Sequence, residues 1–316
     1  MNRTRRHNAG IILGLAVMLL LGVTTNAFSW GYATHAYIDD QILRDSGQLN
    51  RNEIYGGLMP DTFNYLFGLP YQQDLYGLTH YQFAKAWKAA DTIRDKAVAI
   101  GFVSHNDLWG VDVTAHHAGI TFGQDEGYVI AKAKMVKAFM EANVPEYQAL
   151  GVPDDAALMI FHELVEEAVD LRITEQDPEI GYTLALAALS RRPNAPALLV
   201  KAFGADIAGL SGMSSVDTEL FIKQSEAAFR NRMIFYGLAL AQDRATAIQM
   251  LAEQTGGLAE TFLAMYGITL PPGTDLTPLI AYAIGVSIDL CDDYAAEMDA
   301  TRHKVSRELR ARGITY

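Results

Sequence analysis

Six of the eight histidines lie between residues 35 and 162, and most have a carboxylate nearby in the sequence. Imidazole and carboxylate are the ligands expected of zinc where thiolates are absent. The single cysteine, Cys291, excludes both an internal disulfide and a thiolate metal cluster. Any metal ion is therefore expected to be held by nitrogen and oxygen atoms. The six residues are His35, His80, His105, His116, His117 and His162.

The segment MIFHELVEEAVD, Met159 to Asp170, contains the clearest pair of candidate ligands. Its apolar residues recur at helical spacing, so His162 and Glu166, four residues apart, share one face of a helix. This arrangement suits two ligands of one metal ion, and the alternative is a core histidine beside a surface glutamate. A zinc-protease motif would need a second histidine at the position of Glu166, which excludes that class.

A second segment, GFVSHNDLWGVDVTAHHAG from Gly101 to Gly119, holds three histidines and two aspartates. Asp112 and His116 again have four-residue spacing. A solvent-facing polar turn would explain one of these residues, but not so many imidazoles in an acidic chain. Upstream, Asp61 follows a proline and His80 lies in GLTHYQF. Neither residue alone indicates a metal site. They become candidate ligands only together with the other histidines and carboxylates.

The first residues are typical of an export signal. Three arginines precede an apolar run from Ala9 to Val23, and Ala27-Phe28-Ser29 forms a small-x-small cleavage site. Cleavage after Ser29 would make Trp30 the new N-terminus, five residues before His35. We therefore expect a signal peptide over residues 1–29 and a periplasmic or secreted protein. The alternative is an uncleaved membrane anchor, for which this run is short.

Helical spacing recurs through most of the remaining chain, whereas the strict alternation of half-buried strands is rare. We predict an all-α fold, a single multi-helix bundle domain over residues 30–316. The candidate ligands fall within 30–170, and the Ala- and Leu-rich region 176–316 is expected to extend the bundle. The expected helices cover residues 84–105, 127–142, 154–175, 215–242, 245–266 and 276–312. The expected breaks fall at residues 56–57, 68–70, 151–153, 192–193 and 271–273, with a long flexible loop at 209–215.

The formal net charge of the chain is −12. An acidic surface repels a polyanion, so stable binding to duplex nucleic acid is not expected. The charge does not exclude a local cationic site, least of all one made by metal ions. The oligomeric state is not predicted.

Taken in order, the candidates resemble the ligand series of the bacterial zinc-dependent phospholipase C family. Its superfamily includes the single-strand-specific zinc nucleases of fungi and plants. The resemblance covers residues 30–170 and implies a helical protein whose mature chain begins at a tryptophan and holds three zinc ions in a cleft. The series comprises Trp30, His35, Asp61, His80, His105, an aspartate, His116 or His117, His162 and Glu166.

The resemblance implies three zinc sites. One zinc would take the free amine and carbonyl of Trp30 together with His35. A second would take His80 and His105, with an aspartate bridging these two metals. Asp61 would lie close by as a ligand or general base, and it is the predicted catalytic residue.

The third zinc would take His162, Glu166 and one histidine of the doublet. His116 is slightly preferred over His117, but the sequence leaves both open.

The bridging aspartate departs from the family pattern. The family places it four residues after the histidine matched by His105, where this chain has Trp109. A short insertion would restore the pattern through Asp112, whose spacing to His116 allows both to point inward from one helical turn. Asp107 is the second choice.

The resemblance implies an exported zinc-dependent phosphoric ester hydrolase. The preferred activity is a phospholipase C that cleaves glycerophospholipids to diacylglycerol and a phosphorylated head group by metal-activated water, with transient contact to a membrane surface. Glu166, the absence of disulfides and the acidic charge favour this activity. The five-residue step from Trp30 to His35 favours the alternative, a single-strand-specific nuclease or 3'-nucleotidase. A noncatalytic exported helical protein that binds metal is a second alternative.

Overall fold

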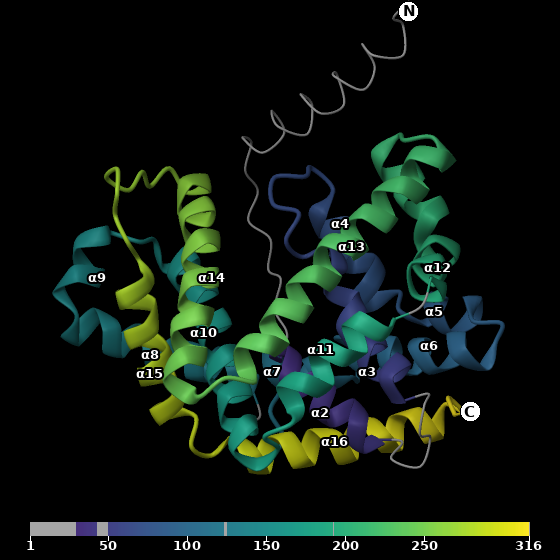
Figure 1. Cartoon of the computed structure of the whole chain (residues 1–316), viewed down its shortest axis with the longest axis horizontal. Helices are drawn as coiled ribbons and strands as arrows, with labels where there is room; N and C mark the ends of the chain where they lie inside the picture. Colours follow the sequence, from purple (N-terminus) through teal and green to yellow (C-terminus); the bar gives the residue numbers. More distant parts are fainter. Residues whose placement is uncertain (1–29, 43–49, 123–124, 192, 316) are drawn as a thin grey trace, which may run out of the picture.

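The computed structural model of the chain describes residues 30–42, 50–122, 125–191 and 193–315 (Figure 1). Every regular element in these ranges is helical, and no strand occurs within them. The predicted all-α class is therefore confirmed. The predicted signal peptide, residues 1–29, lies outside the described residues.

The first part of the chain consists mainly of short helices joined by tight turns, up to the long helix α10. These elements are α2 (Tyr32–Ile42), α3 (Asn50–Leu58), a 3-10 helix (Met59–Phe63), α4 (Gln72–Tyr76), a π-helical turn (Gly77–Tyr81), α5 (Ala84–Ala89), α6 (Ile93–His105), α7 (Val111–His116), α8 (Tyr128–Asn143), α9 (Pro145–Leu150) and α10 (Asp154–Gln176).

The second part consists of longer helices that form the rest of the bundle. They are α11 (Ile180–Ser190), α12 (Asn194–Ser211), α13 (Ser215–Leu240), α14 (Arg244–Met265), α15 (Thr277–Leu290) and α16 (Tyr294–Ala311). No single described helix is both long and apolar enough to cross a bilayer. The helices α12 and α13 meet those criteria only as a pair bent by 114°.

Two of the predicted helices are each divided in the structure. The predicted helix 84–105 is interrupted between α5 and α6, because Thr92 begins a new helix there. The Thr92 side chain accepts a hydrogen bond from the backbone of Asp95, and the Asp95 side chain accepts one from the backbone of Thr92. The predicted helix 276–312 is interrupted by a turn between α15 and α16.

Two predicted irregular segments are wrong. The expected flexible loop at 209–215 is mostly helix, because α12 continues to Ser211. Gly212 then adopts a left-handed conformation (φ 71°) and Ser214 caps α13. The expected break at Gly56 and Gly57 is also absent, since both glycines lie buried inside α3.

These α3 glycines allow unusually close contact with α6. A Cβ atom at Gly56 would lie 2.1 Å from the carbonyl oxygen of Val98, and one at Gly101 would lie 1.9 Å from that of Glu53. The two backbones therefore touch directly. This contact fixes the position of the C-terminal end of α6, where His105 lies.

The two parts of the chain share one helical assembly around α10 and α13. Figure 1 shows α13 running across the molecule and α16 lying along the edge that carries α2. The helix α10 contacts α2 and α8 from the first part and α14 and α15 from the second. Likewise α13 contacts the 3-10 helix that carries Asp61. The second part therefore helps to enclose the candidate ligands.

The contact between α3 and α6 predicts the outcome of a glycine substitution. Gly101→Ala would force backbone against backbone, so the free energy of unfolding should fall by about 1–3 kcal/mol. The matched control is Gly257→Ala in α14, where an added Cβ meets nothing within 4 Å. This control should gain about 0.5–1 kcal/mol from helix propensity. Urea denaturation followed by circular dichroism measures both, and equal stability of the two variants would contradict the prediction.

Candidate metal centre

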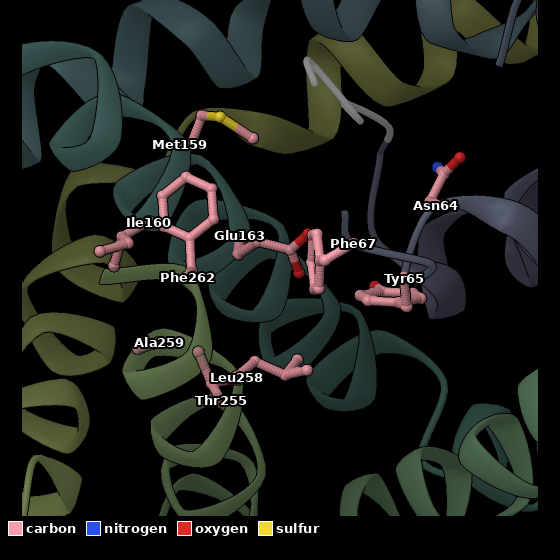
Figure 2. A pocket seen from close by; sticks show the side chains of 10 residues that line it. All are labelled: Asn64, Tyr65, Phe67, Met159, Ile160, Glu163, Thr255, Leu258, Ala259 and Phe262. Carbon is pink, nitrogen blue, oxygen red and sulfur yellow. The ribbon is translucent and has the colours of Figure 1, made fainter. Parts of the chain in front are cut away.

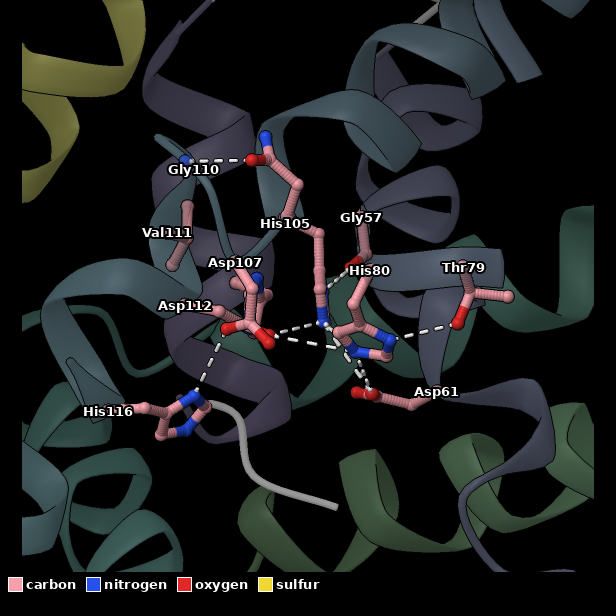
Figure 3. Close-up of polar contacts among 12 residues, drawn as sticks. Gly57, Asp61, Thr79, His80, His105, Asp107, Gly110, Val111, Asp112 and His116 are labelled. Carbon is pink, nitrogen blue, oxygen red and sulfur yellow. Dashed lines mark hydrogen bonds and ion pairs between the residues drawn. The ribbon is translucent and has the colours of Figure 1, made fainter. Parts of the chain in front are cut away.

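The predicted ligands come from separate elements and converge in three adjoining groups. Figure 3 shows five members of these groups, Asp61, His80, His105, Asp112 and His116. Within each group, one ligand atom from every residue lies within 4.8 Å of the others, and all these residues are buried. The groups are His35, His105 and Asp112; Asp61, His80 and His105; and His116, His162 and Glu166. His105 belongs to the first two groups, so these two are continuous.

Asp112 lies at the junction of the first two groups. Its Oδ1 is 3.1 Å from Nε2 of His35, and its Oδ2 is 2.8 Å from Nε2 of His105. The same Oδ2 lies 3.7 Å from Nε2 of His80. This is the place predicted for a bridging carboxylate.

Asp61 completes the second group. Its Oδ1 lies 3.3 Å from Nε2 of His80 and 3.5 Å from Nε2 of His105. The same Oδ1 accepts a hydrogen bond of 2.6 Å from the side-chain amide of Asn64. The other oxygen, Oδ2, is buried and has no hydrogen-bond partner among the described residues.

Two of the imidazoles are oriented by contacts on their far side. His105 Nδ1 lies 2.7 Å from the carbonyl oxygen of Gly57. His80 Nδ1 lies 2.8 Å from the Thr79 hydroxyl and 3.2 Å from the carbonyl oxygen of Tyr76. A carbonyl acceptor requires the proton on Nδ1, which leaves Nε2 with a lone pair. The two Nε2 atoms are 3.2 Å apart, an arrangement that a cation between them would stabilise.

The pKa directions are those of a buried cation site. Burial favours the neutral acid, but the charges and hydrogen bonds of His105 and His80 outweigh it and lower the pKa of Asp61 to about 2. His105 and His35 likewise hold the pKa of Asp112 well below its usual range against burial. Burial lowers the pKa of His35 and of His162. Burial also lowers the pKa of His105, but the Asp112 and Asp61 carboxylates outweigh it and raise this pKa well above its usual range. A bound divalent cation would displace the proton of His105 and take its place as the counter-charge of the two carboxylates.

The third group lies on α10 and α7. His162 Nε2 is 3.0 Å from Oε1 of Glu166, one turn further along α10. The ring of His116 lies beside that of His162, with centroids 5.3 Å apart. The helical pairing expected from the sequence is present, and His116 is the member of the doublet that joins it.

His117 and Asp107 form a separate contact beside this group. His117 is exposed, and its Nε2 lies 3.2 Å from Oδ1 of Asp107. The same oxygen is 3.5 Å from Nδ1 of His116, and Oδ2 accepts a hydrogen bond from the Tyr76 hydroxyl. Asp107, His116 and His117 thereby form a fourth group whose ligand atoms also lie within 4.8 Å of one another, with His117 exposed. Asp107 does not lie between His35 and His105.

Trp30 is fully buried next to the helix that carries two candidate ligands. Its indole Nε1 donates a 3.0 Å hydrogen bond to the Thr114 hydroxyl, halfway between Asp112 and His116 on α7. Its ring stacks on Tyr128 with a centroid distance of 5.3 Å. These contacts hold the start of the described chain at the metal centre.

Asp170 is a structural residue of the centre that the sequence analysis missed. Its carboxylate accepts hydrogen bonds from the backbone amides of Ala33 (2.7 Å) and Thr34 (2.8 Å) and from the Tyr236 hydroxyl (2.9 Å). A Cβ atom at Gly31 would lie 2.5 Å from it. Asp170 thereby ties the start of α2 to α10. Asp170 lies one helical turn after Glu166, and this spacing could have indicated that both carboxylates face the same side of α10.

The donor set fits a divalent cation. Nitrogen and oxygen ligands converge without a thiolate, and they are buried and oriented from behind. The ion-pair partners of Asp61 within the described ranges are His80 and His105, not a lysine or an arginine. Buried carboxylates so arranged are suited to hold metal ions.

Comparisons of the chain with known proteins add no assignment. No model of a known protein family, no curated protein and no solved structure matches it. What the chain does must therefore be inferred from these side chains.

The two histidines of the doublet should differ in metal binding. His116→Ala removes a member of the group on α10 and should cost about one bound divalent ion per chain, since a site that loses one of three protein ligands binds weakly. His117→Ala removes only an exposed ring and should keep the full metal content. Elemental analysis after dialysis against zinc measures both, and the reverse order would show that His117 is the ligand.

Proposed function

We propose that the chain is an exported zinc-dependent phosphoric ester hydrolase of the phospholipase C type. The observation that carries the proposal is the continuity of the buried ligand groups through Asp112 and His105. Two-metal sites that act on phosphate esters use such closely spaced ions. The ordered resemblance of the ligand series to zinc-dependent phospholipases C supports the same assignment.

Three zinc ions would occupy the centre. The first would be held by the backbone amine and carbonyl of Trp30 with His35 and Asp112. The second would be held by Asp61, His80, His105 and Asp112. The third would be held by His116, His162 and Glu166.

Asp61 is the residue we assign to proton transfer. When bound, zinc ions would lower the pKa of a water molecule and neutralise charge at phosphorus. Asp61 keeps a low pKa despite its burial and is ionised at neutral pH, so its unpartnered Oδ2 can accept a hydrogen bond from the attacking water. Asn64 holds the other oxygen and thereby fixes the orientation of the carboxylate.

A pocket beside Asp61 supports an apolar substrate group (Figure 2). Its cavity volume is about 50 Å³, and it opens to solvent on one side. Its walls come from the segment after Asp61, from α10 and from α14, and most of the side chains are apolar. They are Asn64, Tyr65, Phe67, Met159, Ile160, Glu163, Thr255, Leu258, Ala259 and Phe262. Acyl chains of a phospholipid suit such a lining.

The aromatic rings in this pocket favour one alternative, a single-strand-specific nuclease. Tyr65 and Phe67 meet edge to face at 6.2 Å, and Phe262 lies 6.3 Å from Phe67. Such rings also stack nucleobases. Tyr76, another aromatic residue between Asp61 and His80, stacks on His80 instead. A noncatalytic metal-binding protein has less support, because a closed structural site would leave no role for the unpartnered oxygen of Asp61.

Hydrolysis by the zinc-loaded protein tests the proposal. Protein starting at Trp30 should cleave phosphatidylcholine, and Asp61→Asn should lower kcat by about 10²- to 10⁴-fold because the general base is lost. The matched control is Asp289→Asn, at an exposed position of α15, which should keep wild-type activity. Zinc content measured in parallel separates loss of the base from loss of metal. Cleavage of single-stranded DNA alone would establish the alternative, and turnover of neither substrate would refute the proposal.

The role assigned to the Trp30 amine gives a separate prediction. An α-amine has a pKa of about 7.7–8.0, so zinc can displace its proton at modest cost. One extra residue before Trp30 removes that amine and should lower both zinc content, by about one ion per chain, and turnover. Comparison of proteins that begin Trp30 and Met-Trp30 measures this. Equal zinc content and equal turnover would exclude the amine as a ligand.

A further inference from the structure

An arginine of the second part of the chain covers Tyr65, four residues after Asp61, and forms no ion pair with any described residue. Arg232 of α13 is half-buried, and its guanidinium carbon lies 3.8 Å from the ring centroid of Tyr65. Its Nε is shielded from solvent and has no hydrogen-bond partner in the described part of the chain. A half-buried guanidinium without an ion-pair partner keeps N–H donors available for an anionic ligand.

A series of contacts connects Arg232 to the metal centre. Tyr65, which its guanidinium covers, follows Asn64, and Asn64 holds Asp61. The Tyr65 hydroxyl is hydrogen-bonded to that of Tyr32 on α2. The guanidinium thus lies over the segment that positions the catalytic carboxylate.

Glu163 lies in the same pocket as the residues that link Arg232 to Asp61. It lines this pocket together with Tyr65, which lies under the guanidinium, and Asn64, which holds Asp61. Figure 2 shows the Glu163 carboxylate turned toward Phe67 and Tyr65 in the pocket.

The ion pair between Arg191 and Glu226 of α13 shows how a structural arginine is paired in this protein. Arg191 contacts Glu226 on α13 with two nitrogens, Nε at 2.7 Å and a terminal nitrogen at 2.8 Å. Arg232 forms no such contact with Glu163 or with any other described carboxylate. Simple charge compensation of Glu163 would be expected to produce a similar pair.

We propose that the Arg232 guanidinium binds a phosphoryl oxygen of the substrate beside Asp61. This rests on the proposed function and adds a binding residue that lies outside the ligand series. Guanidinium groups bind phosphoryl oxygens through charged, often paired hydrogen bonds. Phospholipids and nucleotides both carry this group, so the proposal holds for either substrate.

Binding of inorganic phosphate to the zinc-loaded protein tests this role without requiring turnover. In isothermal titration, Arg232→Gln should weaken phosphate binding by about 10- to 100-fold, because a charged hydrogen bond is lost. Arg232→Lys keeps the positive charge but loses the paired N–H donors of the guanidinium. Its phosphate affinity should lie between those of the wild type and Arg232→Gln. Zinc content should be the same in all three proteins. Unchanged phosphate affinity in Arg232→Gln would overturn the proposal.

Arg230→Gln is the matched control. Arg230 is also half-buried with an unpartnered Nε, but side chains two positions apart point to different sides of a helix. Its charge acts on Tyr55, beside Glu226. This variant should bind phosphate like the wild type. An equal loss in Arg230→Gln would mean that nonspecific charge or helix disruption causes the effect, which would also overturn the proposal.

Kinetics separate this inference from the proposed function. Arg232→Gln should lower kcat/KM at least about 10-fold on whichever of phosphatidylcholine and single-stranded DNA the wild type cleaves, with partial rescue by Arg232→Lys. An unchanged kcat/KM would refute the role of Arg232 while the hydrolase remained. If the wild type cleaved neither substrate, the proposed function would fail, and the phosphate titration alone would decide whether Arg232 binds a phosphoryl group.

Discussion

The contact of the Asp112 carboxylate with His35 and His105 is the interaction on which the centre depends. Two imidazole nitrogens approach its two oxygens at 3.1 and 2.8 Å in a region closed to solvent. Burial of a carboxylate is costly unless positive charge or several donors compensate it. Asp112 and Asp61 raise the pKa of the buried His105 well above its usual range, so a proton on His105 compensates part of their charge. Under the proposed function, divalent cations would replace this proton and compensate both carboxylates.

The helices around this contact are arranged to keep it fixed. The glycines of α3 let α6 approach until His105 reaches the Gly57 carbonyl. Asp170 ties the first turn of α2, and with it His35, to the helix that carries His162 and Glu166. Ligands from distant parts of the sequence are thus positioned through backbone contacts. Small side-chain rearrangements cannot easily disperse them.

The sequence predicted the features that depend on local spacing. The pairing of His162 with Glu166 follows from four-residue spacing on one helix, and the all-α class follows from apolar periodicity. It could not predict features that arise from tertiary packing. Gly56 and Gly57 were expected to break the chain but lie within α3, where close packing against α6 outweighs their low helix propensity. The choice between His116 and His117 likewise depends on which ring faces α10.

The second part of the chain contributes to the centre even though no predicted ligand lies in it. The helix α14 supplies a wall of the pocket beside Asp61, and α13 supplies Tyr236 to Asp170 and Arg232 to Tyr65. A ligand series confined to residues 30–170 would leave those sides of the site open. Metal ions can activate any phosphate ester for hydrolysis. The side chains that line the adjacent pocket and the charged groups beside the metal ions determine which ester binds. Under the proposed function, substrate preference is therefore expected to depend on α13 and α14 as much as on the ligands themselves.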